Sequence, residues 1–91
     1  MNNNPIGLFD SGMGGLSVLN EIRAALPEES LIFFGDGVRC PYGSRPEAEV
    51  LQFTVEAVER LIAEGCKLIV IACNTATAVA IDYLRAHYPQ I

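Results

Sequence analysis

The sequence has few basic residues: six Lys and Arg stand against eleven Asp and Glu, for a net charge of −5. It lacks the basic stripe that binds phosphate backbones, so nucleic acid is not expected as a partner. Its longest apolar run, residues 68–73, is far too short to cross a bilayer, and no membrane association is expected. The N-terminus lacks the basic and apolar regions of a secretion signal, which indicates a cytoplasmic protein.

Cysteine and histidine are also scarce. The three cysteines form no C-x-x-C pair and have one histidine for company. A disulfide framework and a metal site are therefore not expected, and reduced thiols suit the cytoplasm.

The chain does have a high apolar content for its length. Its 91 residues are 51% hydrophobic, which predicts one domain with one core over residues 1–91. Three short apolar runs, residues 6–9, 31–34 and 68–72, are continuous rather than alternating and predict strands covered on both faces. Helical periodicity follows each run and ends near Pro27, Gly65 and Pro89. The expected apolar stripes are Leu19, Ile22 and Leu26; then Val50, Leu51, Thr54, Val55, Val58, Leu61 and Ile62; then Ala76, Val79, Ala80, Tyr83, Leu84 and His87.

The order β-α-β-α-β-α predicts an α/β fold. We expect a three-layer sandwich with a parallel sheet, right-handed crossovers and helices on both faces. Three strands make a thin sheet with exposed edges, so we expect the chain to be part of a larger assembly.

Polar and glycine-rich segments follow each predicted strand, at residues 10–15, 35–43 and 73–75. The carboxyl ends of parallel strands meet at one edge of a sheet, where ligands bind. In the first segment, Gly12, Gly14 and Gly15 precede a helix whose N-terminus favours an anion. The alternative is a tight turn with Ser11 as the helix cap. Asp10 argues against a simple turn, because a carboxylate there needs water or a cationic partner.

The second segment is rich in glycine and proline. Ser44 and Glu47 have the spacing of a capping box, which predicts a structural role for both. Just before them, Tyr42 and Gly43 offer a phenol and a backbone N–H that could hold a carboxylate, or they form a surface turn.

The third segment begins with Cys73, which ends a buried strand and opens a helix. The N-terminus of a helix favours the thiolate, and Asn74 and Thr75 add hydrogen-bond donors. The alternative is an inert core thiol, an interpretation that fits Cys66 better. His87 falls in the last turn of the final helix, where the helix dipole is enough to explain it.

Taken together, the three segments resemble the glutamate racemases. The resemblance rests on residues 6–16 (IGLFDSGMGGL), 35–43 (GDGVRCPYG) and 72–76 (ACNTA). It implies two pseudo-symmetric α/β domains, of which this chain is the N-terminal part, and assembly as a homo-oligomer. It also implies interconversion of L- and D-glutamate without a cofactor, supplying peptidoglycan synthesis.

In that family, two cysteines face opposite sides of the substrate Cα. The resemblance makes Cys73 one acid/base and lets Asp10 position or activate it. The substrate-binding residues it implies are Asp10, Ser11, Tyr42, Gly43, Asn74 and Thr75. The second cysteine would come from the other domain, so the 91-residue chain alone is expected to be inactive. Two alternatives stay open at this point: a racemase of another amino acid such as aspartate, and a non-catalytic flavodoxin-like binding module.

Overall fold

The computed structural model describes residues 3–12 and 14–91; Met13, which belongs to the first motif, lies outside them. The strands are β1 (Ile6–Asp10), β2 (Leu31–Gly35) and β3 (Leu68–Ile71), and the helices are α1 (Gly15–Ala25), α2 (Glu47–Ala63) and α3 (Asn74–His87). A short 3₁₀ helix, η1 (Tyr42–Ser44), precedes α2 and was not predicted. The alternation of strands and helices confirms the α/β prediction.

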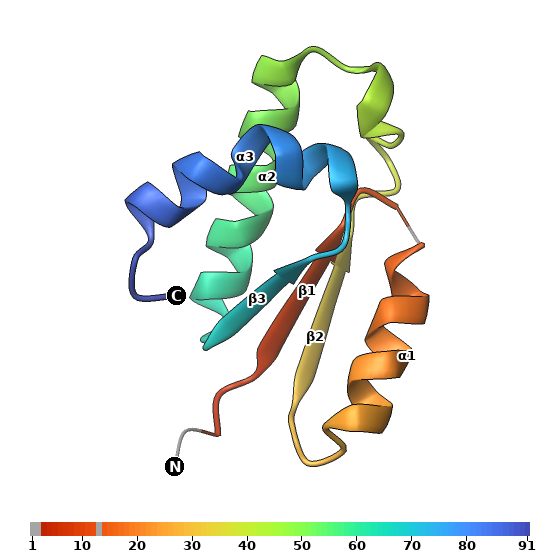
Figure 1. The fold of residues 1–91 in the computed structure, drawn as a ribbon, viewed down its shortest axis with the longest axis vertical. Coiled ribbons are helices and arrows are strands. Elements are labelled where there is room, and N and C mark those ends of the chain that lie inside the picture. The colour runs from red at the N-terminus through yellow and green to blue at the C-terminus, as the bar shows by residue number, and fades with distance from the viewer. Residues whose placement is uncertain (1–2, 13) are drawn as a thin grey trace.

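The three strands form one parallel sheet in the order β2-β1-β3. In the register, Leu8 of β1 lies between Phe33 of β2 and Val70 of β3. All five residues of β1 are buried, as expected for a central strand covered on both faces. The strands therefore end at the same edge of the sheet, which lies uppermost in Figure 1.

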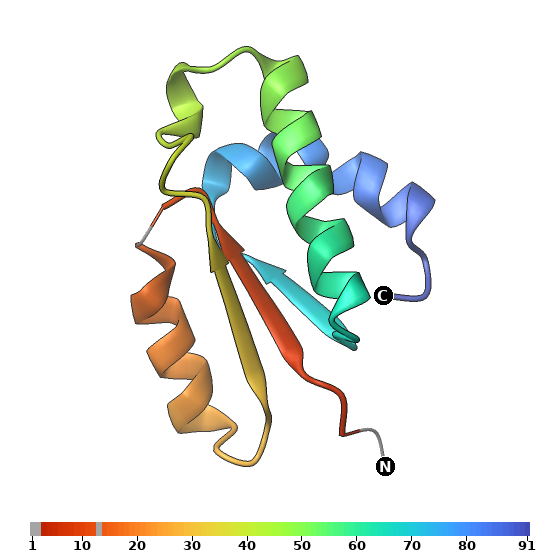
Figure 2. The same cartoon turned by 180° about the vertical axis from the view of Figure 1, so that it is seen from behind.

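Helices cover both faces of the sheet. Figures 1 and 2 show α1 on one side and α2 and α3 on the other. Side chains alternate accordingly, since Gly7 faces Leu61 of α2 whereas Asp10 faces Gly15 of α1. This arrangement confirms the predicted three-layer sandwich.

The main core lies between the sheet and α2. Its buried members are Phe9, Tyr42, Val50, Ala57, Leu61, Cys66, Cys73 and Ala76. Phe9 stacks on Phe34 with ring centroids 5.9 Å apart and is fully buried. Burial of a large apolar side chain of this kind contributes about 1.5–3 kcal/mol to folding. Because Tyr42 and Cys73 belong to the same cluster, the core also supports the edge where the strands end.

Three local predictions were wrong. The apolar stripe of α3 is narrower than expected: Tyr83 and His87 are exposed and stack on each other with ring centroids 3.9 Å apart, and the buried residues of this helix are Ala76, Ala80 and Leu84. Leu26 lies just past the end of α1 and is 47% exposed, so the apolar stripe of this helix is Leu19 and Ile22 alone. Ser44 does not cap α2: the cap position is Pro46, which has no side-chain hydrogen bond, and the Ser44 hydroxyl donates to the Pro41 carbonyl at 3.2 Å. Because the N-cap is Pro46, α2 begins two residues too far along the chain for Ser44 to cap it.

Candidate active site

The segments at the ends of the three strands meet at one edge of the sheet, which we call the rim: residues 10–12, 14–15, 35–46 and 72–75. Backbone hydrogen bonds join them. The Asp36 N–H donates to the Asp10 carbonyl at 3.0 Å, and the Ala72 N–H donates to the Phe9 carbonyl at 2.8 Å. The predicted convergence is therefore confirmed.

The Asp10 carboxylate ends β1 and is nearly buried, with the residue 9% exposed. One oxygen accepts the Ser11 N–H at 2.8 Å and the other accepts the Gly15 N–H at 2.7 Å. The sequence offered Ser11 as the residue that accepts a hydrogen bond at the N-terminus of α1, and in the structure Asp10 does so instead. The cap position itself is Gly14, which makes no side-chain capping bond. Backbone donors, rather than a required cationic partner, hold this carboxylate.

Two glycines allow the backbone to approach closely at the rim. A Cβ atom at Gly35 would lie 2.6 Å from the Gly12 carbonyl oxygen, and one at Gly15 would lie 2.8 Å from the Asp10 Cβ. Atoms that close overlap, so larger residues there would push the first two rim segments apart.

Cys73 occupies the N-cap position of α3. Its Sγ accepts a hydrogen bond from the Ala76 N–H at 3.4 Å, and the residue is 8% exposed. The predicted position at a strand end and helix start is confirmed. Asn74, exposed, and Thr75, half-buried, follow in the first turn, where backbone N–H groups have no partner within the helix. The sulfur therefore sits at the positive end of the helix dipole, where negative charge is stabilised.

Tyr42 is placed differently from what a surface loop would suggest. It is 1% exposed, its ring lies 6.1 Å from that of Phe9 and 5.8 Å from that of Phe53, and its hydroxyl donates to Asp36 Oδ2 at 2.5 Å. Burial, followed by the hydrogen bond to Asp36, raises the pKa of the Tyr42 phenol. The phenol therefore stays protonated and its proton is already donated within the protein.

Gly43, the next residue, is exposed at the rim. A Cβ atom there would lie 3.9 Å from the Thr75 hydroxyl oxygen, so the second and third segments are neighbours. The structure thus brings Gly43 and Thr75 together, and the residues before them include Tyr42 and Cys73, which share one core cluster.

The other two cysteines have different surroundings. Cys40 is exposed, and its thiol donates to the Gly37 carbonyl at 3.1 Å. Cys66 is buried beside Gly7, near the start of β3 and thus at the far end of the sheet, as expected. Burial, then the charge of Glu64, raises the pKa of the Cys66 thiol. Of the three, Cys73 is the one at a helix N-terminus on the rim.

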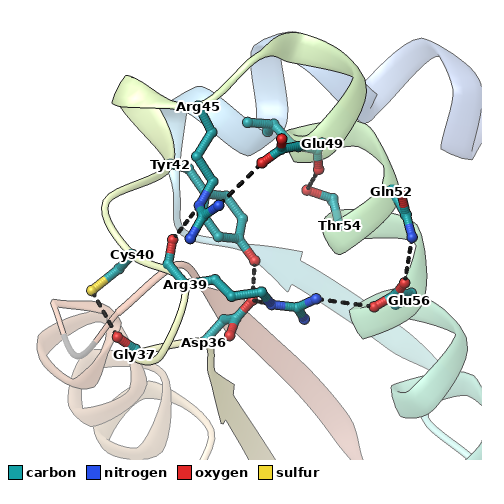
Figure 3. Close-up of polar contacts among 11 residues, drawn as sticks. Asp36, Gly37, Arg39, Cys40, Tyr42, Arg45, Glu49, Gln52, Thr54 and Glu56 are labelled. Carbon is teal, nitrogen blue, oxygen red and sulfur yellow. Dashed lines mark hydrogen bonds and ion pairs between the residues drawn. The ribbon is translucent and has the colours of Figure 1, made fainter.

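Sequence reasoning gave no role to two rim residues, Asp36 and Arg39. Asp36 is 6% exposed and accepts hydrogen bonds from Tyr42 and from Arg39 Nε, the latter at 2.7 Å (Figure 3). The available signal was an aspartate at the end of an apolar strand with an arginine three positions later.

Within residues 3–12 and 14–91, no group of three or more His, Cys, Asp or Glu side chains could hold a metal ion. In the same part of the chain, no helix is long and apolar enough to cross a membrane.

The chain was compared with known proteins. No protein-family model matches it. It is 59% identical over 85 residues to glutamate racemase of Cupriavidus pinatubonensis, covering 93% of this chain and 31% of that relative. It is 57% identical to glutamate racemase of Exiguobacterium sibiricum, covering 91% of this chain and 31% of the relative.

Solved structures agree with these sequence matches. Glutamate racemase of Francisella tularensis, in complex with D-glutamate, superimposes with a TM-score of 0.89 at 42% identity, over 94% of this chain and 33% of that one. The Escherichia coli glutamate racemase, in complex with L-glutamate and the activator UDP-MurNAc-ala, gives a TM-score of 0.85 at 41% identity, over 93% and 33% of the two chains.

The three-stranded parallel sheet with its three helices is thus a fold that solved glutamate racemases share. More narrowly, the chain is homologous to the glutamate racemases along nearly its whole length. It spans about a third of the length of the relatives it matches.

Proposed function

We propose that the protein containing this chain is a glutamate racemase that interconverts L- and D-glutamate without a cofactor, and that Cys73 is one of its two acid/base groups. One observation carries the proposal: a thiol caps the N-terminus of α3 at the edge where three segments converge. The high identity to proteins named glutamate racemase supports the choice of substrate.

Inversion at Cα requires a proton to leave one face of the carbon and another to arrive on the opposite face. In the proposed reaction, the Cys73 thiolate removes the Cα proton of one enantiomer, and the Cys73 thiol returns a proton in the reverse direction. The resulting carbanion needs donors that are already in place. The proposed donors are the N–H groups and side chains of Asn74 and Thr75, the Ser11 side chain and the backbone at Tyr42–Gly43.

Asp10 is proposed to attract the substrate and to help position or activate Cys73. Its carboxylate lies at the end of the central strand, in the first rim segment, and carries a negative charge toward which a substrate ammonium would be drawn. Its two backbone contacts hold the turn before α1, which keeps that charge in one place.

The acid/base for the other face is proposed to come from outside residues 1–91. Cys66 lies near the start of β3, at the wrong end of the sheet, and its buried thiol favours the neutral form. A second domain, or a second copy in a homo-oligomer, would supply the missing group. Two free thiols would also require a reducing compartment such as the cytoplasm, where D-glutamate would serve peptidoglycan synthesis.

The test uses the complete gene product that contains this chain. We expect Cys73→Ser to abolish racemisation in both directions with substrate binding largely intact, because a hydroxyl is a far weaker base than a thiolate. Cys40→Ser is the matched control, since that thiol is exposed and bonded only within its own loop among the described contacts. Circular dichroism of D- and L-glutamate measures inversion, and deuterium entry at Cα from heavy water measures proton exchange. Near-normal turnover by Cys73→Ser would rule out the assignment, and turnover of aspartate in place of glutamate would correct the substrate.

A further inference from the structure

The carboxylate of Asp36 is buried at the end of β2, with its side chain 7% exposed. Its Oδ2 atom accepts two hydrogen bonds, from the Tyr42 hydroxyl at 2.5 Å and from Arg39 Nε at 2.7 Å (Figure 3). A buried carboxylate is costly unless it is paired and hydrogen-bonded. Asp36 therefore depends on both donors, and together these three residues, which we call the Asp36 lock, fix the fold of one loop.

Arg39 ties the lock to α2. Its Nη1 lies 3.2 Å from Glu56 Oε1, and its guanidinium carbon lies 3.9 Å from the centre of the Phe53 ring. Arg45 makes a parallel set of contacts, since its Nε donates to the Arg39 carbonyl at 2.7 Å and its Nη1 lies 3.0 Å from Glu49. The loop is thus fastened to α2 on both sides of η1 (Figure 3).

The lock determines what the loop offers at the rim. Because the Tyr42 hydroxyl donates to Asp36, the phenol points into the protein, and the loop presents its backbone and the exposed Gly43 instead. Gly43 lies beside Thr75, which is the second residue after Cys73, the N-cap of α3. A small shift of the loop would therefore move Gly43 relative to the first turn of α3.

We propose that the Asp36 lock positions the Tyr42–Gly43 segment for binding glutamate, and that Arg39 is a positioning residue for racemisation. The inference rests on the proposed function. Arg39 reaches Asp36, Glu56 and Phe53, behind the rim, and acts through Tyr42. Since Cys73 is held by α3 itself, loosening the lock weakens substrate binding more than proton transfer.

The experiment measures kcat and KM in both directions on the complete gene product. In Arg39→Met, the Asp36 carboxylate loses a charged partner, and we expect KM for glutamate to rise about tenfold, the scale of one charged hydrogen bond. We expect kcat to fall by less than about threefold, because the interaction lost serves binding. Arg39→Lys keeps the positive charge but loses the planar guanidinium group, so its KM should lie between those of the parent and Arg39→Met.

Glu56→Gln is the matched control. It removes the outer partner of Arg39 but leaves both donors on Asp36, so KM should stay within about twofold of the parent, as for an exposed ion pair. Tyr42→Phe is the second test variant, because it keeps the ring packing while removing one donor, and its KM should also rise. It decides the question if Arg39→Met does not fold.

The outcomes are distinct. Unchanged KM in Arg39→Met and Tyr42→Phe overturns the inference. A fall in kcat with KM unchanged also overturns it, because that is the signature of fewer folded molecules, which thermal unfolding of each variant would verify. A parent protein that does not racemise glutamate overturns the proposed function and this inference with it, whereas an active parent with unaffected variants overturns the inference alone.

Discussion

Replacing Asp10 by asparagine tests whether its carboxylate holds the turn between β1 and α1. The parent carboxylate accepts two backbone N–H groups, from Ser11 and Gly15. An asparagine amide has one oxygen, so one of these donors would face an NH₂ group and lose its partner. Leaving a buried donor unsatisfied costs about 1–3 kcal/mol. Removing a negative charge from the N-terminus of α1 costs about 0.3–1 kcal/mol more.

The two effects together predict a loss of roughly 1–4 kcal/mol in the free energy of unfolding. Domains of this size have about 5–15 kcal/mol in total, so the change is large. Urea unfolding of the 91-residue chain, followed by far-UV circular dichroism, would show it as a lower midpoint with an unchanged slope. Ser17→Ala is the control: the Ser17 hydroxyl donates to the Gly14 carbonyl at the exposed start of the same helix, and its loss should cost less than about 0.5 kcal/mol.

The same variant should lose activity for a separate reason. In the complete gene product, at a temperature where Asp10→Asn is still folded, we expect racemisation to fall by about two orders of magnitude or more, the scale of a lost acid/base or positioning group. A midpoint equal to that of the parent would refute the capping argument, and activity within a few-fold of the parent would make Asp10 purely structural.

Two further predictions concern the rim. Gly35→Ala would place a Cβ 2.6 Å from the Gly12 carbonyl oxygen and should lower the free energy of unfolding in urea by about 1–3 kcal/mol. Gly37→Ala is the control: a Cβ there has nothing within 4 Å, so the free energy of unfolding should change by less than about 0.5 kcal/mol. Equal effects of the two substitutions would contradict the close approach at Gly35. Burial is the main reason that the pKa of Tyr42 is raised in the folded state, whereas an unfolded tyrosine ionises near pH 10. The neutral phenol therefore contributes fully to the free energy of unfolding below about pH 10. Above that pH the contribution declines by about 1.4 kcal/mol per pH unit. Between pH 9 and 11, the free energy of unfolding in urea should fall less steeply for Tyr42→Phe than for the parent. Absorbance at 295 nm reports tyrosine ionisation, and ionisation of every tyrosine in the folded protein would contradict this prediction.

The element order and the rim could be predicted from the sequence because they depend on local signals. Continuous apolar runs gave the strands, helical periodicity gave the helices, and parallel topology alone requires the strand ends to share one edge. The position of Cys73 followed in the same way, since the end of an apolar run and the start of a helical period adjoin at that residue. Leu26 was misplaced because the ring of Pro27 disfavours the helical conformation at the residue before it, so α1 ends at Ala25.

Tyr42 and Asp36 could not be placed from sequence because their surroundings come from distant parts of the chain. Tyr42 lies in a Gly- and Pro-rich loop, which is typical of a surface turn. Its burial depends on Phe9 from β1 and Phe53 from α2. Asp10 was misjudged for a related reason: its partner Gly15 lies five residues later, and only the actual path of the turn brings that N–H within 2.7 Å.

These contacts divide the rim residues by function. Three polar side chains of the rim, Asp10, Asp36 and Tyr42, are nearly buried, and each makes its hydrogen bonds within its own turn or loop. The proposed substrate-binding groups lie nearer the surface: Gly43 and Asn74 are exposed, and Thr75 is half-buried. In the proposed reaction, these small side chains and backbone donors would bind the charged groups of a compact amino acid, and the Cys73 thiol would exchange the proton. We therefore expect changes to Asp36 and Tyr42 to act through geometry, and changes to Cys73 to act through chemistry.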